Sequence, residues 1–114
     1  MELNKLSDKK EWKELIKNSP NDYELIIYKH SPICPISHVT EAVINDWCNV
    51  HSEYNHIKIL KVNVVFSKSL SRRIAKDLGI VHESPQIIWL DRGMKVKFHA
   101  SHYDINEEKL NKYL

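Results

Sequence analysis

One part of the sequence restricts the fold more than any other: a short apolar run that leads directly into a long helical pattern. Residues 24–30 are rich in β-forming side chains and stop at Ser31, which is typical of a strand buried on both faces. Residues 35–50 follow with apolar side chains at helical spacing, and Pro35 suits a first helical position. Another strand-like run covers 57–64. Strand–helix–strand units favour parallel strands, so the segment predicts an α/β fold.

Two further helices are indicated on either side of this unit. The first covers residues 8–18, and Ser7 is placed to cap it. The other begins at Ser67 or Ser69, carries apolar side chains at intervals of four, and ends at Gly79. In the central helix we expect Val39, Val43 and Trp47 to form the buried stripe.

A hairpin and a last helix complete the chain. Residues 86–90 and 94–100 read as antiparallel strands, and Gly93 between them can supply the positive φ of a turn. Asp104, followed three residues later by Glu107, resembles a capping box that opens the last helix. The order of elements predicts a mixed four-stranded sheet with helices on both faces.

Length and composition exclude several classes of protein. The chain has 114 residues, 42% apolar and 28% charged, which predicts a single domain over residues 1–114. The net charge of +2 is too small to predict nucleic-acid binding. No run approaches the roughly 20 apolar residues of a membrane span, and residues 1–10 carry no apolar signal segment. We therefore expect a cytoplasmic protein without membrane or nucleic-acid partners, in which cysteines are reduced.

The residues with most chemical content follow the first strand, in the segment His30-Ser-Pro-Ile-Cys-Pro-Ile-Ser-His38. Cys34 falls between a strand and the first turn of a helix, where unpaired N–H groups stabilise an anion. The thiolate is the nucleophilic form of cysteine, so this position is typical of thiol–disulfide exchange. An inert buried thiol fits less well, because Pro32 and Pro35 mark an exposed junction. We predict Cys34 as the catalytic residue.

Position 37 holds serine where a dithiol oxidoreductase carries its second cysteine. The motif Cys34-Pro35-Ile36-Ser37 is thus a monothiol form, in which Pro35, Ile36 and Ser37 support the reactive sulfur. Cys34 can form a mixed disulfide but cannot close an internal disulfide with position 37. A second thiol from solution has to complete the cycle. Ser37 either hydrogen-bonds to the sulfur or caps a backbone group.

A second informative segment precedes the third strand, at Gly79-Ile-Val-His-Glu-Ser-Pro-Gln86. Proline is tolerated immediately before a strand but not within one. The position favours a cis Ser84–Pro85 bond over an ordinary trans proline. In that arrangement the backbone N–H and C=O of Ser84 can pair with an extended substrate or thiol ligand, as a short added strand.

The other cysteine and histidine residues form weaker patterns. Cys48 lies on the apolar side of its helix, where core packing is expected. His30 and His38 flank the Cys34 segment, but structural histidines are commoner than catalytic ones in such settings. A metal site would draw on Cys34, Cys48, His99 and His102. There is no Cys-x-x-Cys pair, so we expect no bound metal.

The chain resembles the monothiol bacilliredoxins of the YtxJ type, which are thioredoxin-fold proteins of the bacillithiol system. The resemblance runs from about residue 8 to the end and rests on three segments. They are Lys29-His-Ser…Cys34-Pro-Ile-Ser37, Ile74-Ala75…Gly79-Ile…His82-Glu-Ser-Pro-Gln86, and Ser101-His102. It implies a thioredoxin-like fold with a mixed four-stranded sheet.

The resemblance also implies an activity. Such proteins take bacillithiol from protein mixed disulfides onto their own cysteine, which would be Cys34. It implies bacillithiol as co-substrate, no tightly bound cofactor, and S-bacillithiolated proteins as partners. The family usually carries threonine before the cysteine, whereas this chain has Ile33, which makes the local surface more apolar.

Two other functions stay open at this point. One is a glutathione-linked or iron–sulfur-carrying monothiol glutaredoxin-like protein, for which Lys29, Arg72 and Arg73 are the available basic groups. The other is a non-catalytic thioredoxin-fold binding module that holds a partner at the Pro85 edge. Retained function in Cys34→Ser would favour the binding module.

Overall fold

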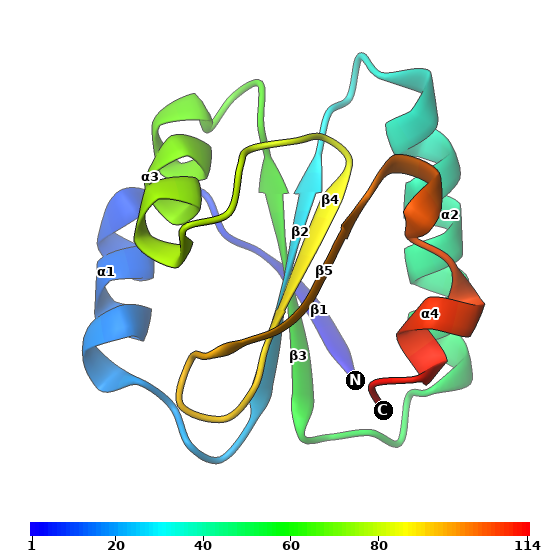
Figure 1. Ribbon diagram of the computed structural model, residues 1–114, viewed down its shortest axis with the longest axis horizontal. Helices are drawn as coiled ribbons and strands as arrows, with labels where there is room; N and C mark the ends of the chain where they lie inside the picture. Colours follow the sequence, from blue (N-terminus) through cyan, green and yellow to red (C-terminus); the bar gives the residue numbers. More distant parts are fainter.

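The computed structural model describes residues 1–114, apart from the side chain of residue 2. Five strands form one mixed sheet, with α1 and α3 on one face and α2 and α4 on the other (Figure 1). The strands are β1 (Glu2–Lys5), β2 (Glu24–His30), β3 (Ile57–Asn63), β4 (Gln86–Leu90) and β5 (Val96–Ser101). The helices are α1 (Lys9–Asn18), α2 (Pro35–Val50), α3 (Lys68–Leu78), the 3₁₀ turn η1 (His102–Asp104) and α4 (Glu107–Asn111).

The predicted α/β fold is confirmed, but the sheet has one strand more than the four expected. The order is β1-β3-β2-β4-β5, in which β3 runs parallel to both β1 and β2, while β4 runs antiparallel to β2 and β5. The additional strand, β1, is an edge strand of four residues that pairs with Lys58–Lys61. Its pairing rests on backbone groups, so a four-residue polar sequence gives no periodic signal of it.

Ser67 and Gly79 cap α3 as expected, whereas the N-caps proposed for α1 and α4 are displaced. Asp8, not Ser7, is the N-cap of α1, and its carboxylate accepts the N–H three residues later at 2.8 Å. Asn106, not Asp104, caps α4 in the same way at 3.0 Å. Asp104 lies in η1, one turn earlier. Adjacent residues of capping type make such shifts hard to foresee.

The buried face of α2 also differs from the expected one. Val39 is 55% exposed, and the buried side chains are Ser37, Thr40, Ile44 and Trp47. The first turn of α2 therefore faces the sheet with hydroxyl groups rather than with valine. The Ser37 hydroxyl is hydrogen-bonded to the end of β2, and an apolar stripe could not mark such a polar contact.

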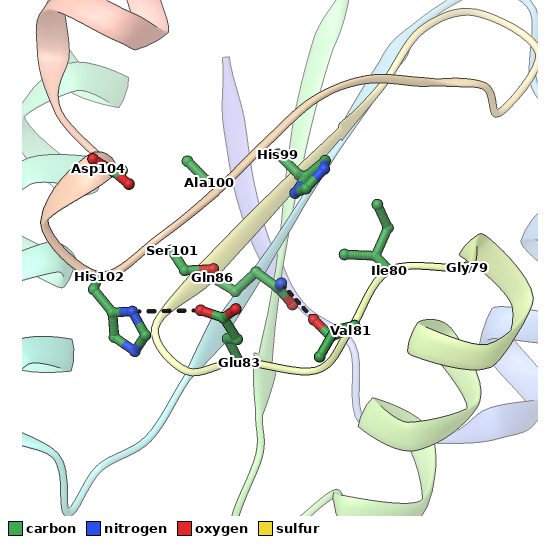
Figure 2. A pocket seen from close by; sticks show the side chains of 10 residues that line it. All are labelled: Gly79, Ile80, Val81, Glu83, Gln86, His99, Ala100, Ser101, His102 and Asp104. Atoms are coloured by element: carbon green, nitrogen blue, oxygen red, sulfur yellow. Dashed lines mark hydrogen bonds and ion pairs between the residues drawn. The ribbon is translucent and has the colours of Figure 1, made fainter.

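The loop from Gly79 to Pro85 links α3 to β4 across the end of the sheet. Gly79 closes α3 with a φ of 67°, a left-handed conformation that glycine adopts without a steric cost. Beyond it, the loop and β5 border a pocket of about 510 Å³ (Figure 2). The side chain of Gln86 reaches from β4 into the wall of this pocket and donates to the Val81 carbonyl at 2.9 Å.

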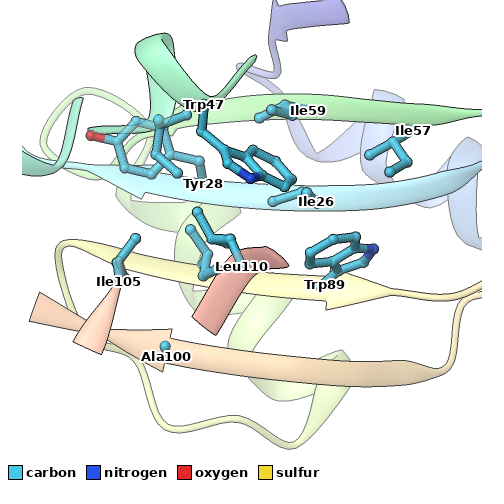
Figure 3. Close-up of a cluster of buried hydrophobic side chains, with 11 residues drawn as sticks. Ile26, Tyr28, Trp47, Ile57, Ile59, Trp89, Ala100, Ile105 and Leu110 are labelled. Carbon is cyan, nitrogen blue, oxygen red and sulfur yellow. The ribbon is translucent and has the colours of Figure 1, made fainter. Parts of the chain in front are cut away.

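The sheet separates two apolar cores, because the side chains of each central strand alternate between its faces. The core beneath α2 and α4 gathers aromatic residues from distant parts of the chain (Figure 3). Trp47 and Trp89 meet there edge to face with ring centroids 5.7 Å apart, and Leu110 of α4 closes the cluster. Trp12 lies fully buried in the other core. All three tryptophans are thus core residues.

Candidate active site

Cys34 lies where β2 ends and α2 begins. It is the N-cap residue of α2, with an extended backbone, and its side chain is partly exposed. Its N–H donates to the Ser31 carbonyl at 3.3 Å, and its own carbonyl accepts the Ser37 N–H at 3.0 Å. Pro35 occupies the first helical position. The structure therefore places Cys34 at the N-terminus of α2, beside the backbone N–H groups of its first turn.

These N–H groups lower the pKa of the Cys34 thiol. The largest contribution is the hydrogen bond from the Ser37 backbone. Burial opposes it, and the Ile36 backbone and the Ser37 hydroxyl add smaller contributions that lower the pKa. The sulfur is thus stabilised as the thiolate, the form that attacks disulfides. Pro35 has no N–H to contribute, so its part is to open the helix at this residue.

Ser37 joins the first turn of α2 to the end of β2. Its hydroxyl accepts the Ser31 N–H at 3.2 Å, and its carbonyl accepts the Tyr28 hydroxyl at 3.3 Å. The side chain is fully buried. Of the two roles that the sequence left open, capping a backbone group is thus observed, and the same hydroxyl also favours the Cys34 thiolate.

Tyr28 was not found by sequence reasoning, although it supports this turn from below. It is fully buried, and its hydroxyl lies 2.8 Å from His30 Nδ1 as well as close to Ser37. His30 is 3.8 Å from the Glu41 carboxylate, which also binds Lys61. The alternation of β2 is the one signal available for this network, because it places residues 28 and 30 on the same face.

The two neighbouring histidines do not hydrogen-bond to the Cys34 sulfur among the described contacts. Burial, with a contribution from Lys61, lowers the pKa of His30 and favours its neutral form. His38 lies on the surface, where its Nε2 contacts the Pro32 carbonyl at 3.0 Å. Their rings meet edge to face with centroids 5.8 Å apart. Both histidines therefore contribute to the structure around Cys34.

Ser84 and Pro85 lie at the same end of the sheet as Cys34. The Ser84–Pro85 peptide bond is cis. Lys29 of β2 pairs with Gln86 of β4, so continuing this antiparallel register places Ser84 beside Ser31, in the loop that carries Cys34. The Ser84 hydroxyl is buried and has no hydrogen-bond partner. An unpaired polar group thus lies at the end of the sheet where the loop with Cys34 begins.

Large apolar side chains are exposed around this end of the sheet. Ile33 is 81% exposed, Phe66 84%, Val81 80% and Tyr103 71%. They belong to the loops that follow β2, β3 and β5 and to the loop that precedes β4. These loops all lie at the same end of the sheet (Figure 1). Their exposure leaves apolar surface at this end of the sheet that a partner could bury.

Cys48 lies far along α2 from Cys34. Fourteen residues of helix separate them, about 21 Å along the axis, so they cannot form a disulfide while α2 is intact. Cys48 packs against the core, its sulfur lies 3.7 Å from the Met1 carbonyl, and burial raises its pKa. Its environment is that of an unreactive thiol.

Two kinds of feature are not found among the described residues. No three histidine, cysteine or acidic side chains are grouped so that they could hold a metal ion. In the same part of the chain, no helix combines the length and apolarity needed to cross a membrane.

Comparison with solved structures identifies the fold. A candidate oxidoreductase with a thioredoxin fold is 27% identical, with 97% of this chain and 92% of that chain covered and a TM-score of 0.80. Thioredoxin O2 from Arabidopsis thaliana is 18% identical, covers 96% of this chain and 89% of its own, and has a TM-score of 0.72. Mitochondrial thioredoxin 3 from Saccharomyces cerevisiae is 22% identical, with 96% and 91% covered and a TM-score of 0.69. The predicted thioredoxin-like fold is confirmed.

Comparison with protein families covers almost the whole chain. Residues 4–110 match the family described as monothiol bacilliredoxin BrxC. This range includes Cys34, the serine three residues later, and the Ser84–Pro85 pair. The chain therefore belongs to the monothiol bacilliredoxin family.

Proposed function

We propose that this protein is a monothiol thiol–disulfide oxidoreductase that removes bacillithiol from protein mixed disulfides, with Cys34 as the nucleophile. The observation that carries the proposal is the setting of Cys34. Cys34 is the N-cap residue of α2, and hydrogen bonding from the first turn of that helix lowers the pKa of its thiol. The position of a resolving cysteine holds a buried serine that fixes this turn. The family supplies the identity of the small thiol.

The reaction takes two exchanges of one thiolate with one disulfide. The Cys34 thiolate attacks the bacillithiol sulfur of a protein–bacillithiol disulfide, and the bond between the two sulfurs breaks. The target protein leaves as a thiolate that takes a proton from water, while bacillithiol remains bonded to Cys34. A free bacillithiol thiolate then attacks that sulfur, so Cys34 is restored and oxidised bacillithiol leaves. One mixed disulfide and one free bacillithiol thiol thus give one target thiol and one molecule of oxidised bacillithiol, so the free bacillithiol is the reductant.

The surroundings of Cys34 suit a partner that is itself a protein. The backbone of Ser84 lies beside the cysteine loop and can pair with an extended segment of the partner. The exposed apolar side chains of Ile33, Val81 and Tyr103 border the same edge of the sheet. A target protein can therefore bury apolar surface against this edge while its mixed disulfide reaches Cys34. A reducing compartment such as the cytoplasm is the proposed setting.

Two basic residues considered for a glutathione carboxylate are engaged elsewhere. Lys29 is fully buried and donates to the Ser71 carbonyl. Arg73 forms an ion pair with Asp77 at 3.1 Å. Neither of these two side chains offers its charge to a ligand on Cys34, whereas Arg72, the third basic residue considered, is exposed.

The test is the release of bacillithiol from a purified S-bacillithiolated protein, followed by the mass of that protein over time. We expect release with the intact chain and with Cys48→Ser, and none above background with Cys34→Ser. Circular dichroism of each variant controls for folding. Equal rates with a glutathionylated target would keep the mechanism and overturn the choice of thiol. Full activity of Cys34→Ser would overturn the enzymatic proposal in favour of a binding module.

A further inference from the structure

Lys29 is an unusual residue in the centre of the sheet, because its ammonium group is buried without a counter-ion. It lies in β2, is fully buried, and points to the face covered by α3. Its Nζ donates to the Ser71 carbonyl at 3.0 Å and contacts His82 Nδ1 at 3.1 Å. Among the side chains that the structure describes, no carboxylate forms an ion pair with it. A buried charge of this kind is costly, so it invites a functional explanation.

The partner of Lys29 belongs to the loop between α3 and β4, where the Ser71 hydroxyl of α3 also lies 3.1 Å from His82 Nδ1. Gln86, the register partner of Lys29, is 1% exposed and donates to the Val81 carbonyl at 2.9 Å (Figure 2). Two neighbouring buried side chains of the sheet thus hold two consecutive loop residues, Val81 and His82. The side chains of both loop residues are otherwise exposed.

The residue that these contacts position is Ser84, two residues beyond His82. Its backbone lies beside the loop that carries Cys34, where an extended partner would pair. We propose that the contact between Lys29 and His82 positions loop residues 82–84 for an extended disulfide partner, and that proton uptake by His82 releases this loop. The inference rests on the proposed function for the nature of the partner. Release of the loop itself can be observed without any partner.

The charges that face His82 set the direction of this effect. Its Nδ1 can accept from Lys29 only while the ring is neutral. Burial, then Lys29 of β2 and Arg72 of α3, lower the pKa of His82, and Glu83 of the loop opposes them. His82 therefore takes up a proton at a pH below the ordinary histidine pKa of about 6.5. The protonated ring loses its acceptor and places a second cation beside Lys29, so the contact is lost as the pH falls.

Hydrogen–deuterium exchange of residues 80–84 at a series of pH values tests the release, once rates are corrected for intrinsic exchange. In the intact chain we expect protection to fall at least about tenfold as the pH drops through the titration of His82, because a charge-assisted hydrogen bond is lost. His82→Asn keeps a side-chain acceptor but does not titrate, so protection should stay constant. Lys29→Met keeps the apolar stem, and protection should be low at every pH.

A kinetic measurement connects the loop to the site. With a peptide–bacillithiol disulfide as substrate, KM should rise at acidic pH for the intact chain but not for His82→Asn, whereas kcat follows the Cys34 thiolate in both. Pure loss of structure would change kcat and KM together and would not be rescued by asparagine. Flat protection in the intact chain, or the same pH step in His82→Asn, would overturn the inference. If the chain is inactive toward the peptide but its hydrogen–deuterium exchange still changes with pH, the result would instead count against the proposed function.

Discussion

The substitution Tyr28→Phe removes one buried hydroxyl that supports the active-site turn and leaves Cys34 itself unchanged. The hydroxyl lies 2.8 Å from His30 Nδ1 and 3.3 Å from the Ser37 carbonyl. A net contribution of about 0.5–1.5 kcal/mol for each hydrogen bond predicts a loss of about 1–3 kcal/mol in the free energy of unfolding. The bond to the Ser37 carbonyl is the longer and therefore the weaker of the two. The Glu41 carboxylate, 3.8 Å from His30 Nδ1, remains beside that nitrogen after the substitution. We therefore expect about 1–2 kcal/mol, or about 4–8 °C in Tm.

The same substitution should change the titration of Cys34. The Tyr28 hydroxyl holds the turn whose N–H groups stabilise the thiolate, so the pKa of Cys34 should rise toward its ordinary value. Urea unfolding followed by tryptophan fluorescence gives the stability, and ultraviolet absorbance of the thiolate gives the titration. Tyr103→Phe, which removes a hydroxyl from an exposed ring, is the matched control and should change neither. A stable Tyr28→Phe variant with an unchanged Cys34 titration would refute the reasoning.

Three further predictions concern helix caps, core packing and thiol reactivity. Asp8→Ala should lower the free energy of unfolding by about 1 kcal/mol, and Ser7→Ala by much less, because only Asp8 caps α1; equal losses in urea unfolding would contradict this. Leu110→Ala should cost about 2–5 kcal/mol, since it opens a cavity beneath α4; a thermal unfolding midpoint like that of the intact chain would argue against that packing. In iodoacetamide labelling across a pH series, Cys34 should reach half its maximal rate below the pH of an ordinary thiol, and Cys48 above it. Labelling of Cys48 at a lower pH than Cys34, read from peptide masses, would contradict the assignment of Cys34 as the reactive thiolate.

The central unit of the fold was predictable because its signals are local. The bounds predicted for β2, α2 and β4 agree with the structure, since apolar runs, Pro35 and the residues around Gly93 mark them directly. β1 was missed because an edge strand needs only backbone partners. The N-caps of α1 and α4 were displaced by one or two positions because several suitable side chains stand next to one another.

The position of Cys34 could be predicted for the same reason, whereas the contacts around it could not. Cys34 and Ser37 are three residues apart, so one motif displays both. Tyr28 contacts Ser37 from the strand, and Lys29 contacts His82 across 53 residues of sequence. Such pairs depend on how the strands and loops assemble, and a single sequence carries no record of them. Side-chain alternation in β2 offers the one indication, by assigning its residues to opposite faces.

The most direct test of the central claim is to mix the reduced protein with one equivalent of an S-bacillithiolated protein and stop the exchange with acid before free thiol is added. Intact masses and peptide maps of both proteins then locate the bacillithiol. The account predicts that it leaves the target and appears on the peptide that contains Cys34, with Cys48 unmodified. Bacillithiol that stays on the target, or that is found on Cys48, would contradict the account.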